Sequence, residues 1–195
     1  MNKKILKRFE IAGVFFVYLF ASFLHFIYDW TNGSIVSIIF GAVNESVWEH
    51  MKIFMAAYIL WGIIEVLCVH PPFKQFVAAK VIGLTFLMLA IPLGFYIYTF
   101  FTKEPVLFID IALSVVWVII SLYISYRLTV SEKSLKPYYH ISLLVLLLYV
   151  AMFFSFTVFP PKFEIFRDVQ TGMYGIIPDY IDTGAISLDV MYSKV

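Results

Sequence analysis

Residues 44–52, NESVWEHMK, hold the densest group of chemically reactive side chains in a chain that is otherwise largely apolar. Glu45 and Glu49 are four residues apart and would share one face of an α-helix, whereas His50 would point about 100° away from Glu49. Glu49 and Lys52 are three residues apart and could form an ion pair. Carboxylates and imidazoles ligate zinc and act as general acids and bases. The segment is therefore the first candidate for a functional site.

Two other positions carry groups of the same kind. His25 and Asp29 are one helical turn apart, and a carboxylate at this spacing can fix the tautomer of an imidazole for catalysis or metal binding. Asp110 lies within an apolar run, where a carboxylate is costly and marks a functional site by default. The predicted catalytic candidates are Glu45, Glu49, His50 and Asp110. The predicted ligands of a divalent metal such as zinc are His25, Asp29, Glu49 and His50.

Structural roles compete with these functional ones. Asn44 is a good N-cap, and Glu45 would then lie in the first turn, where the helix dipole favours a carboxylate. His25 and Asp29 could form a purely structural hydrogen bond between packed helices. The chain has no HExxH helix, GxSxG elbow, Walker loop or CxxC pair, so zincin, serine hydrolase, NTPase and thiol-redox functions lack support.

The composition indicates a membrane protein. The chain has 195 residues, of which 62% are hydrophobic and 14% are charged, whereas a soluble domain carries about 25% charged residues. This apolar surface cannot be hidden in one small soluble core, so the lipid bilayer is the expected partner. A net charge of +1 without a long basic run argues against nucleic acid. The single cysteine, Cys68, excludes an internal disulfide and a multi-cysteine metal site.

A spanning helix needs about 20 mostly apolar residues. Five segments meet this length, at approximately 9–29, 44–69, 76–101, 105–127 and 138–159. The apolar run at 35–40 is too short to cross the membrane and predicts a re-entrant or interfacial helix at 34–41. We expect an all-α polytopic membrane bundle, with a five-span transmembrane domain at 1–159 and an extracytoplasmic C-terminal tail at 160–195.

The basic residues predict the orientation of the bundle, because cytoplasmic loops carry an excess of Lys and Arg. With the N-terminus in the cytoplasm, nine of the 14 basic residues lie on the inner side: Lys3, Lys4, Lys7, Arg8, Lys74, Lys80, Arg127, Lys133 and Lys136. Five spans then place the C-terminus outside, as expected for a multi-pass protein of the plasma membrane. In this orientation residues 44–52, His25, Asp29 and Asp110 all come to the outer face.

Three blocks carry a resemblance to a known family: LHFIYDW, AVNESVWEHMK and FPPKFEIFRDVQTGMYGI. Over roughly residues 8–177 the chain resembles a family of uncharacterised small multi-pass membrane proteins of bacteria and archaea, a domain of unknown function. Its most distinctive element is the Asn-Glu-Ser-x-Trp-Glu-His block, and its C-terminal block reads Asp-x-x-Thr-Gly-x-Tyr-Gly-Ile. Members tend to have proline after that aspartate, whereas this chain has Val169, a departure that affects the turn. The resemblance implies a membrane protein and no particular activity.

Besides a structural or accessory subunit, two classes of function remain open. One is binding or transport of a small molecule through a His/carboxylate pocket at the outer membrane face. The alternative is a membrane-embedded, metal-dependent hydrolase or transferase that acts on a lipid-linked or extracytoplasmic substrate. A transporter needs polar groups leading to both sides of the membrane, so Glu10 and Glu65 should join the outer groups in one path. An enzyme needs only the outer pocket, with the inner half of the bundle packed dry.

Overall fold

A computed structural model describes residues 2–177. Its helices are α1 (Lys3–Trp30), α2 (Ile35–Phe40), α3 (Val47–Val69), α4 (Phe73–Thr102), α5 (Leu107–Thr129) and α6 (Tyr139–Val158), with 3₁₀ turns η1 (Lys136–Tyr138) and η2 (Glu164–Phe166). The described residues form no sheet, only an isolated bridge between Arg167 and Tyr174. Five of the helices, all except the short α2, are long and apolar enough to span a membrane. The predicted all-α, five-span bundle is confirmed.

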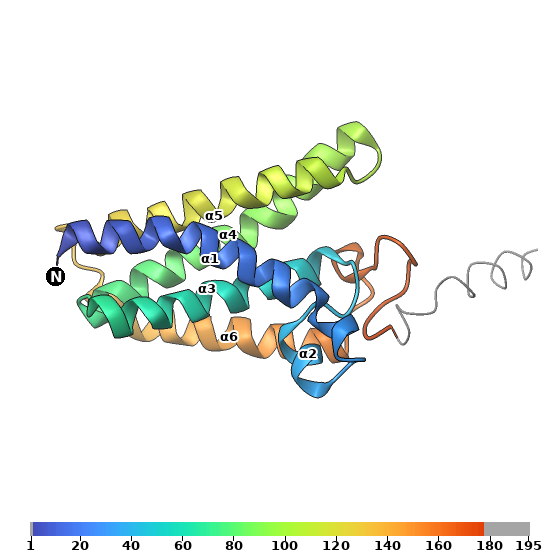
Figure 1. The fold of residues 1–195 in the computed structure, drawn as a ribbon, viewed down its shortest axis with the longest axis horizontal. Helices are drawn as coiled ribbons and strands as arrows, with labels where there is room; N and C mark the ends of the chain where they lie inside the picture. Colours follow the sequence, from blue (N-terminus) through green and yellow to red (C-terminus); the bar gives the residue numbers. More distant parts are fainter. Residues whose placement is uncertain (1, 178–195) are drawn as a thin grey trace, which may run out of the picture.

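The helices run side by side, so that the bundle has two ends (Figure 1). The basic end carries the N-terminus and the α3–α4 and α5–α6 connections. The opposite end, here called the site end, carries α2, the start of α3, the α4–α5 turn and residues 160–177. There the α4–α5 hairpin diverges from the rest of the bundle. As predicted, residues 44–52, the end of α1 and the start of α5 lie at the same end of the bundle.

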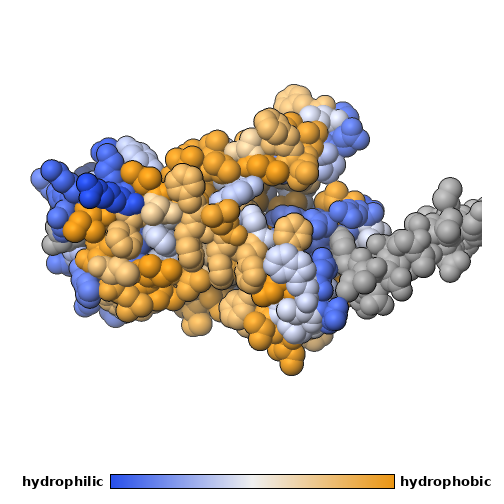
Figure 2. All heavy atoms as spheres, viewed as in Figure 1, coloured by the Kyte–Doolittle hydropathy of each residue, from blue (hydrophilic) through white to orange (hydrophobic). Residues whose placement is uncertain are grey.

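The surface has the character expected of a protein that lies in lipid. An apolar band covers the middle of the bundle and polar side chains gather at its two ends (Figure 2). Large apolar side chains are exposed on this band, among them Phe15, Leu19, Leu89 and Leu147, each more than 60% accessible. Such exposure is unfavourable in water and is satisfied by acyl chains. The molecule is a multi-pass membrane protein.

Helix α3 begins later than its sequence suggests. The sequence predicts Asn44 as the N-cap, but the cap is Ser46, whose hydroxyl accepts a hydrogen bond from the backbone N–H of Glu49 at 3.3 Å. Asn44 instead accepts from the N–H of Ser46 and donates its side-chain amide to the carbonyl of Gly175. Glu45 consequently lies in the connection before the helix, not in its first turn.

A buried ion cluster occupies the basic half of the bundle. Lys80 Nζ of α4 lies 2.8 Å from Glu10 Oε2 of α1 and 2.5 Å from Glu65 Oε2 of α3. All three side chains are buried, and Ser125 of α5 donates a hydrogen bond to Glu10 Oε1. Local spacing predicts Lys7 or Arg8 as the partner of Glu10, whereas its actual partner lies 70 residues away. The cluster ties four helices together.

Candidate functional site

Three side chains converge at the site end of the bundle: His25 from α1, Glu45 from the α2–α3 connection and His50 from the first turn of α3. The two Nε2 atoms are 3.2 Å apart. His25 Nε2 lies 3.5 Å from Glu45 Oε1, and His50 Nε2 lies 3.4 Å from Glu45 Oε2. Each side chain is partly buried. Among the described residues these three are the group whose ligand atoms are close enough to share one metal ion.

The tautomer of His50 follows from its second ring nitrogen. Nδ1 of His50 lies 2.8 Å from the backbone carbonyl of Ser46. A carbonyl oxygen can only accept a hydrogen bond, so Nδ1 carries the hydrogen and a neutral imidazole presents a bare Nε2 lone pair to the cluster. A histidine that ligates a metal is typically oriented by such a hydrogen bond from its other nitrogen.

Glu45 is held in place through its backbone. Its N–H donates to Asp168 Oδ2 at 2.7 Å, and Asp168 is buried and also accepts hydrogen bonds from the N–H groups of Gln170 and Thr171. Burial raises the pKa of the Glu45 carboxyl, but the hydrogen bond to His25 and the charges of the two imidazoles outweigh burial and lower the pKa below its usual range.

The cluster faces a cavity of about 840 Å³, called here the lateral cavity, which is within the size range of ligand pockets. Helices α1, α3, α4 and α5 line it, together with residues 45, 105, 169 and 170. Asp110 lines it from α5, and Tyr98 donates its hydroxyl hydrogen to Asp110 Oδ1 at 2.6 Å. Asp110 therefore has a hydrogen-bond partner and faces the cavity.

Glu49 is not part of this cluster. Its Oε2 lies 2.5 Å from Lys52 Nζ and accepts from the N–H of Val43, and its Oε1 accepts from the hydroxyl of Thr157 in α6. Lys52 Nζ also donates to the carbonyl of Ile38 in α2. Glu49 and Lys52 are each 2% exposed. This pair joins α2, α3 and α6 beneath the site, and the carboxylate of Glu49 is committed to these contacts.

Asp29 is also outside the group. It is partly buried near the end of α1 but does not line the lateral cavity, and the imidazole of His25 lies against Glu45 and His50. Of the predicted site residues, the structure thus brings together His25, Glu45, His50 and Asp110 around one cavity, and leaves Asp29 and Glu49 outside it.

Asp168 is the residue whose role the sequence reasoning missed. The sequence predicts that its block either folds back over the outer mouth of the bundle or remains an exposed turn. In the structure residues 166–177 pack against the site end, where Tyr28 donates to the carbonyl of Ile177 and Asn44 to that of Gly175. The sequence feature that could have revealed this role is the Asp-x-x-Thr-Gly pattern. In the structure Asp168 accepts hydrogen bonds from the N–H and the hydroxyl of Thr171 within this pattern.

Comparisons with known proteins place the chain in a family. No curated protein and no solved structure matches it. A family model described as "Family of unknown function (DUF6512)" matches residues 1–176, which include the five spanning helices and the whole His25–Glu45–His50 cluster. The chain belongs to this family of unknown function.

Proposed function

We propose that the protein is a membrane-embedded, divalent-metal-dependent hydrolase or transferase, with His25, Glu45 and His50 as the metal ligands. The observation that carries the proposal is the spacing of the ligand atoms. Tetrahedral zinc with ligands at about 2.0–2.1 Å separates neighbouring ligand atoms by roughly 3.3 Å. The two imidazole Nε2 atoms are 3.2 Å apart, and each lies within 3.5 Å of one Glu45 oxygen, Oε1 for His25 and Oε2 for His50. With one ligand atom taken from each residue, all three atoms lie within 4.8 Å of one another, so small side-chain shifts would close them around one ion. Three protein ligands leave a fourth position for water or substrate, as in catalytic zinc sites.

The one-sided cavity supports an enzyme over a transporter. The lateral cavity is lined at the site end and does not include Glu10, Glu65 or Lys80. Those three side chains are buried against each other and against Ser125. Between the two clusters lie buried apolar side chains such as Val17, Leu87 and Leu122. Within the described residues, the lateral cavity therefore does not lead a substrate from the cluster into the basic half of the bundle.

The arrangement suits hydrolysis of an ester or phosphoester. A metal lowers the pKa of its bound water to about 7 and polarises the oxygen of the reacting group. If bound by His25, Glu45 and His50, the metal would supply this activated water beside the substrate. Asp110, which lines the same cavity, would accept the proton that the water loses and would return it to the leaving group as the bond to the carbonyl carbon or phosphorus breaks. In a transferase a substrate hydroxyl takes the place of water.

The metal content of purified protein tests the proposal. We expect about one bound zinc or other divalent ion per native chain, and its loss in His50→Ala and Glu45→Gln, because each change removes one of three ligands. His140→Ala is the matched control, since His140 is exposed at the start of α6 and lies outside the cluster. Mass-spectrometric elemental analysis after detergent purification measures the ion.

Three outcomes are decisive. Loss of metal in the two ligand variants but not in His140→Ala supports the site. Native protein that neither contains a divalent ion nor takes one up from zinc or cobalt solutions overturns it, and leaves a protonated imidazole as the partner of Glu45. Equal metal content in native protein and both ligand variants also overturns it, because the ion would then lie elsewhere.

We further propose that the site end faces outward from the plasma membrane. The basic end carries Lys3, Lys4, Lys7 and Arg8 near the N-terminus, and Lys74, Lys133 and Lys136 near the connections, which is typical of the cytoplasmic side. A phosphatase reporter fused after residue 195 is expected to be active outside the cytoplasm. A C-terminal fluorescent fusion that matures only in the cytoplasm should stay dark, and its fluorescence would reverse the orientation.

A further inference from the structure

The lateral cavity is polar at one end and apolar at the other. His25, Glu45 and His50 line its surface end. Its deeper wall includes Tyr18 of α1, which ends at Trp30, and Trp117 of α5, which begins at Leu107. At about 1.5 Å per residue these positions lie roughly 18 and 15 Å below the helix ends. Half of a bilayer's hydrocarbon core is about 15 Å, so the cavity is as deep as one leaflet's acyl chains.

The two serine hydroxyl groups in the deep arm are already hydrogen-bonded to their own helices. Ser22 donates to the carbonyl of Tyr18 at 2.9 Å, and Ser114 donates to the carbonyl of Ile111 at 2.8 Å. The surrounding wall is formed by apolar and aromatic side chains from α3, α4 and α5, including Phe54, Ile91 and Trp117. This lining solvates a hydrocarbon chain and gives a small polar ligand little to bind.

The cavity is also open towards the acyl layer. Phe26 of α1 and Leu107 and Ile111 of α5 line it, yet each is more than 40% exposed on the surface of the bundle. A residue that both lines a cavity and faces lipid marks an opening in the wall. This opening lies between α1 and α5, and the space-filling view shows the molecule indented beside the diverging α4–α5 hairpin (Figure 2).

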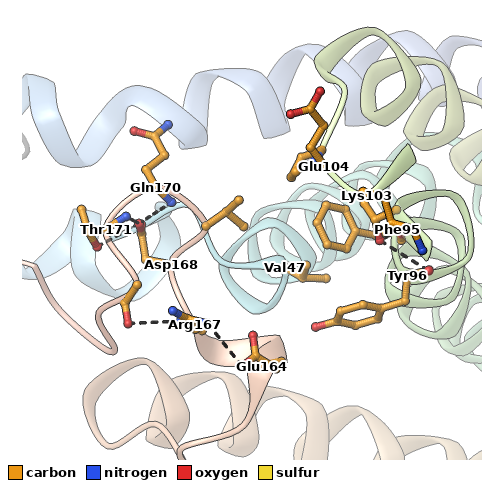
Figure 3. A pocket seen from close by; sticks show the side chains of 14 residues that line it. Val47, Phe95, Tyr96, Lys103, Glu104, Glu164, Arg167, Asp168, Gln170 and Thr171 are labelled. Carbon is orange, nitrogen blue, oxygen red and sulfur yellow. Dashed lines mark hydrogen bonds and ion pairs between the residues drawn. The ribbon is translucent and has the colours of Figure 1, made fainter. Parts of the chain in front are cut away.

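A second, polar cavity of about 390 Å³, called here the vestibule, continues from the first towards the membrane surface. The two share Val47, Phe95, Pro105, Val169 and Gln170 as lining residues. The vestibule is lined by charged groups of both signs, Lys103 and Glu104 from the α4–α5 turn and Glu164 and Arg167 from the C-terminal segment (Figure 3). Such a lining suits a zwitterionic or uncharged polar head group better than a strongly anionic one.

We propose that the substrate of the metal site is an amphiphilic lipid that enters laterally from the bilayer. Its chain lies in the deep arm, its reacting ester or phosphoester bond lies at His25, Glu45 and His50, and its head group extends into the vestibule. The position of the reacting bond rests on the proposed function. The position of the chain rests on the depth, lining and side opening of the lateral cavity alone.

A photo-crosslinking experiment tests the chain position. The probe is a lysophosphatidylcholine that carries a diazirine at the end of its acyl chain, added to native protein in lipid nanodiscs. Peptide mass spectrometry is expected to map crosslinks to the deep wall at Tyr18 and Trp117. Ser114→Trp fills the deep arm, as does Leu113→Trp, and we expect the loss of these crosslinks in either folded variant. Val116→Trp is the matched control, because Val116 lies on the lipid-exposed face of α5.

The same samples separate this proposal from that of the metal site. Loss of deep-wall crosslinks in the cavity variants alone supports the lipid site. Deep-wall crosslinks that are absent from native protein, or unchanged in both cavity variants, overturn it. Metal analysis of native protein is read independently. If native protein contains metal but shows no crosslinks in the cavity, the enzyme proposal stands and the substrate is a different one. If it shows cavity crosslinks but contains no metal, the protein binds lipid and the metal site is wrong. An anionic lysophosphatidylglycerol probe that labels the deep wall better than the zwitterionic one overturns the head-group assignment.

Discussion

Lys80→Met is expected to destabilise the protein by about 3–5 kcal/mol, the usual cost of removing one partner from a buried ion pair. The change leaves the carboxylates of Glu10 and Glu65 without the ammonium group that both contact. It also removes a cation that lies 5.1 Å from the ring centre of Tyr58. The free energy of unfolding in mixed micelles, measured by titration with a denaturing detergent, gives the size of the effect.

Two variants make this measurement specific. Lys74→Met changes the same residue type in the same helix at an exposed position, and it should be nearly neutral. The triple change of Lys80→Met with Glu10→Gln and Glu65→Gln removes the charges together and should recover most of the lost stability. If Lys80→Met matches Lys74→Met in stability, the cluster is not the structural tie described above. It would then have to be reconsidered as part of a polar path.

The spanning helices could be predicted because the bilayer imposes one simple requirement on each, about 20 apolar residues in a row. The depth of a residue within a span can be predicted equally well, because every residue of a helix adds the same rise along its axis. His25, His50 and Asp110 lie near the site ends of their helices, so their meeting at one level follows from counting. The lateral cavity is harder to predict from the sequence, because its size depends on how far the α4–α5 hairpin diverges from the other helices.

The choice between Glu45 and Glu49 could not be made from the sequence. With Asn44 as the cap, both carboxylates share a face, and either could meet the imidazoles. Because Ser46 is the cap, Glu45 lies outside the helix and turns to His25, while Glu49 turns inward to Lys52. A shift of two residues in the helix start decides which carboxylate is available, and helix ends are set by contacts distant in sequence.

Those distant contacts come mainly from the C-terminal segment. Asp168 holds the N–H of Glu45, and the carbonyl of Gly175 accepts from Asn44, which is thereby drawn away from the helix start. Neither contact has a periodic signature, because both join loops that are far apart in the sequence. The pairing of Lys80 with Glu10 is of the same kind, since local spacing predicts Lys7 or Arg8. Sequence reasoning therefore found the groups but not all of their partners.

Lys52→Met is expected to have an effect as large as Lys80→Met, about 3–5 kcal/mol, because it leaves the buried Glu49 carboxylate uncompensated. It also removes the hydrogen bonds of Lys52 Nζ to the carbonyl of Ile38 and the hydroxyl of Thr157, which join α2 and α6 to α3. Lys103→Met is the matched control, because Lys103 is an exposed lysine at the same end of the bundle. The same detergent titration measures both variants.

The double variant Glu49→Gln with Lys52→Met decides whether Glu49 belongs to the metal site. It removes both charges, and the amide oxygen of the introduced glutamine can still accept from Val43 or Thr157, so most of the stability should return. Its metal content should equal that of native protein, because the ligand atoms of His25, Glu45 and His50 are untouched. A stable double variant that has lost its metal would show that Glu49 ligates the ion. The ion would then have to draw its carboxylate away from Lys52, and the ligand set proposed here would be wrong.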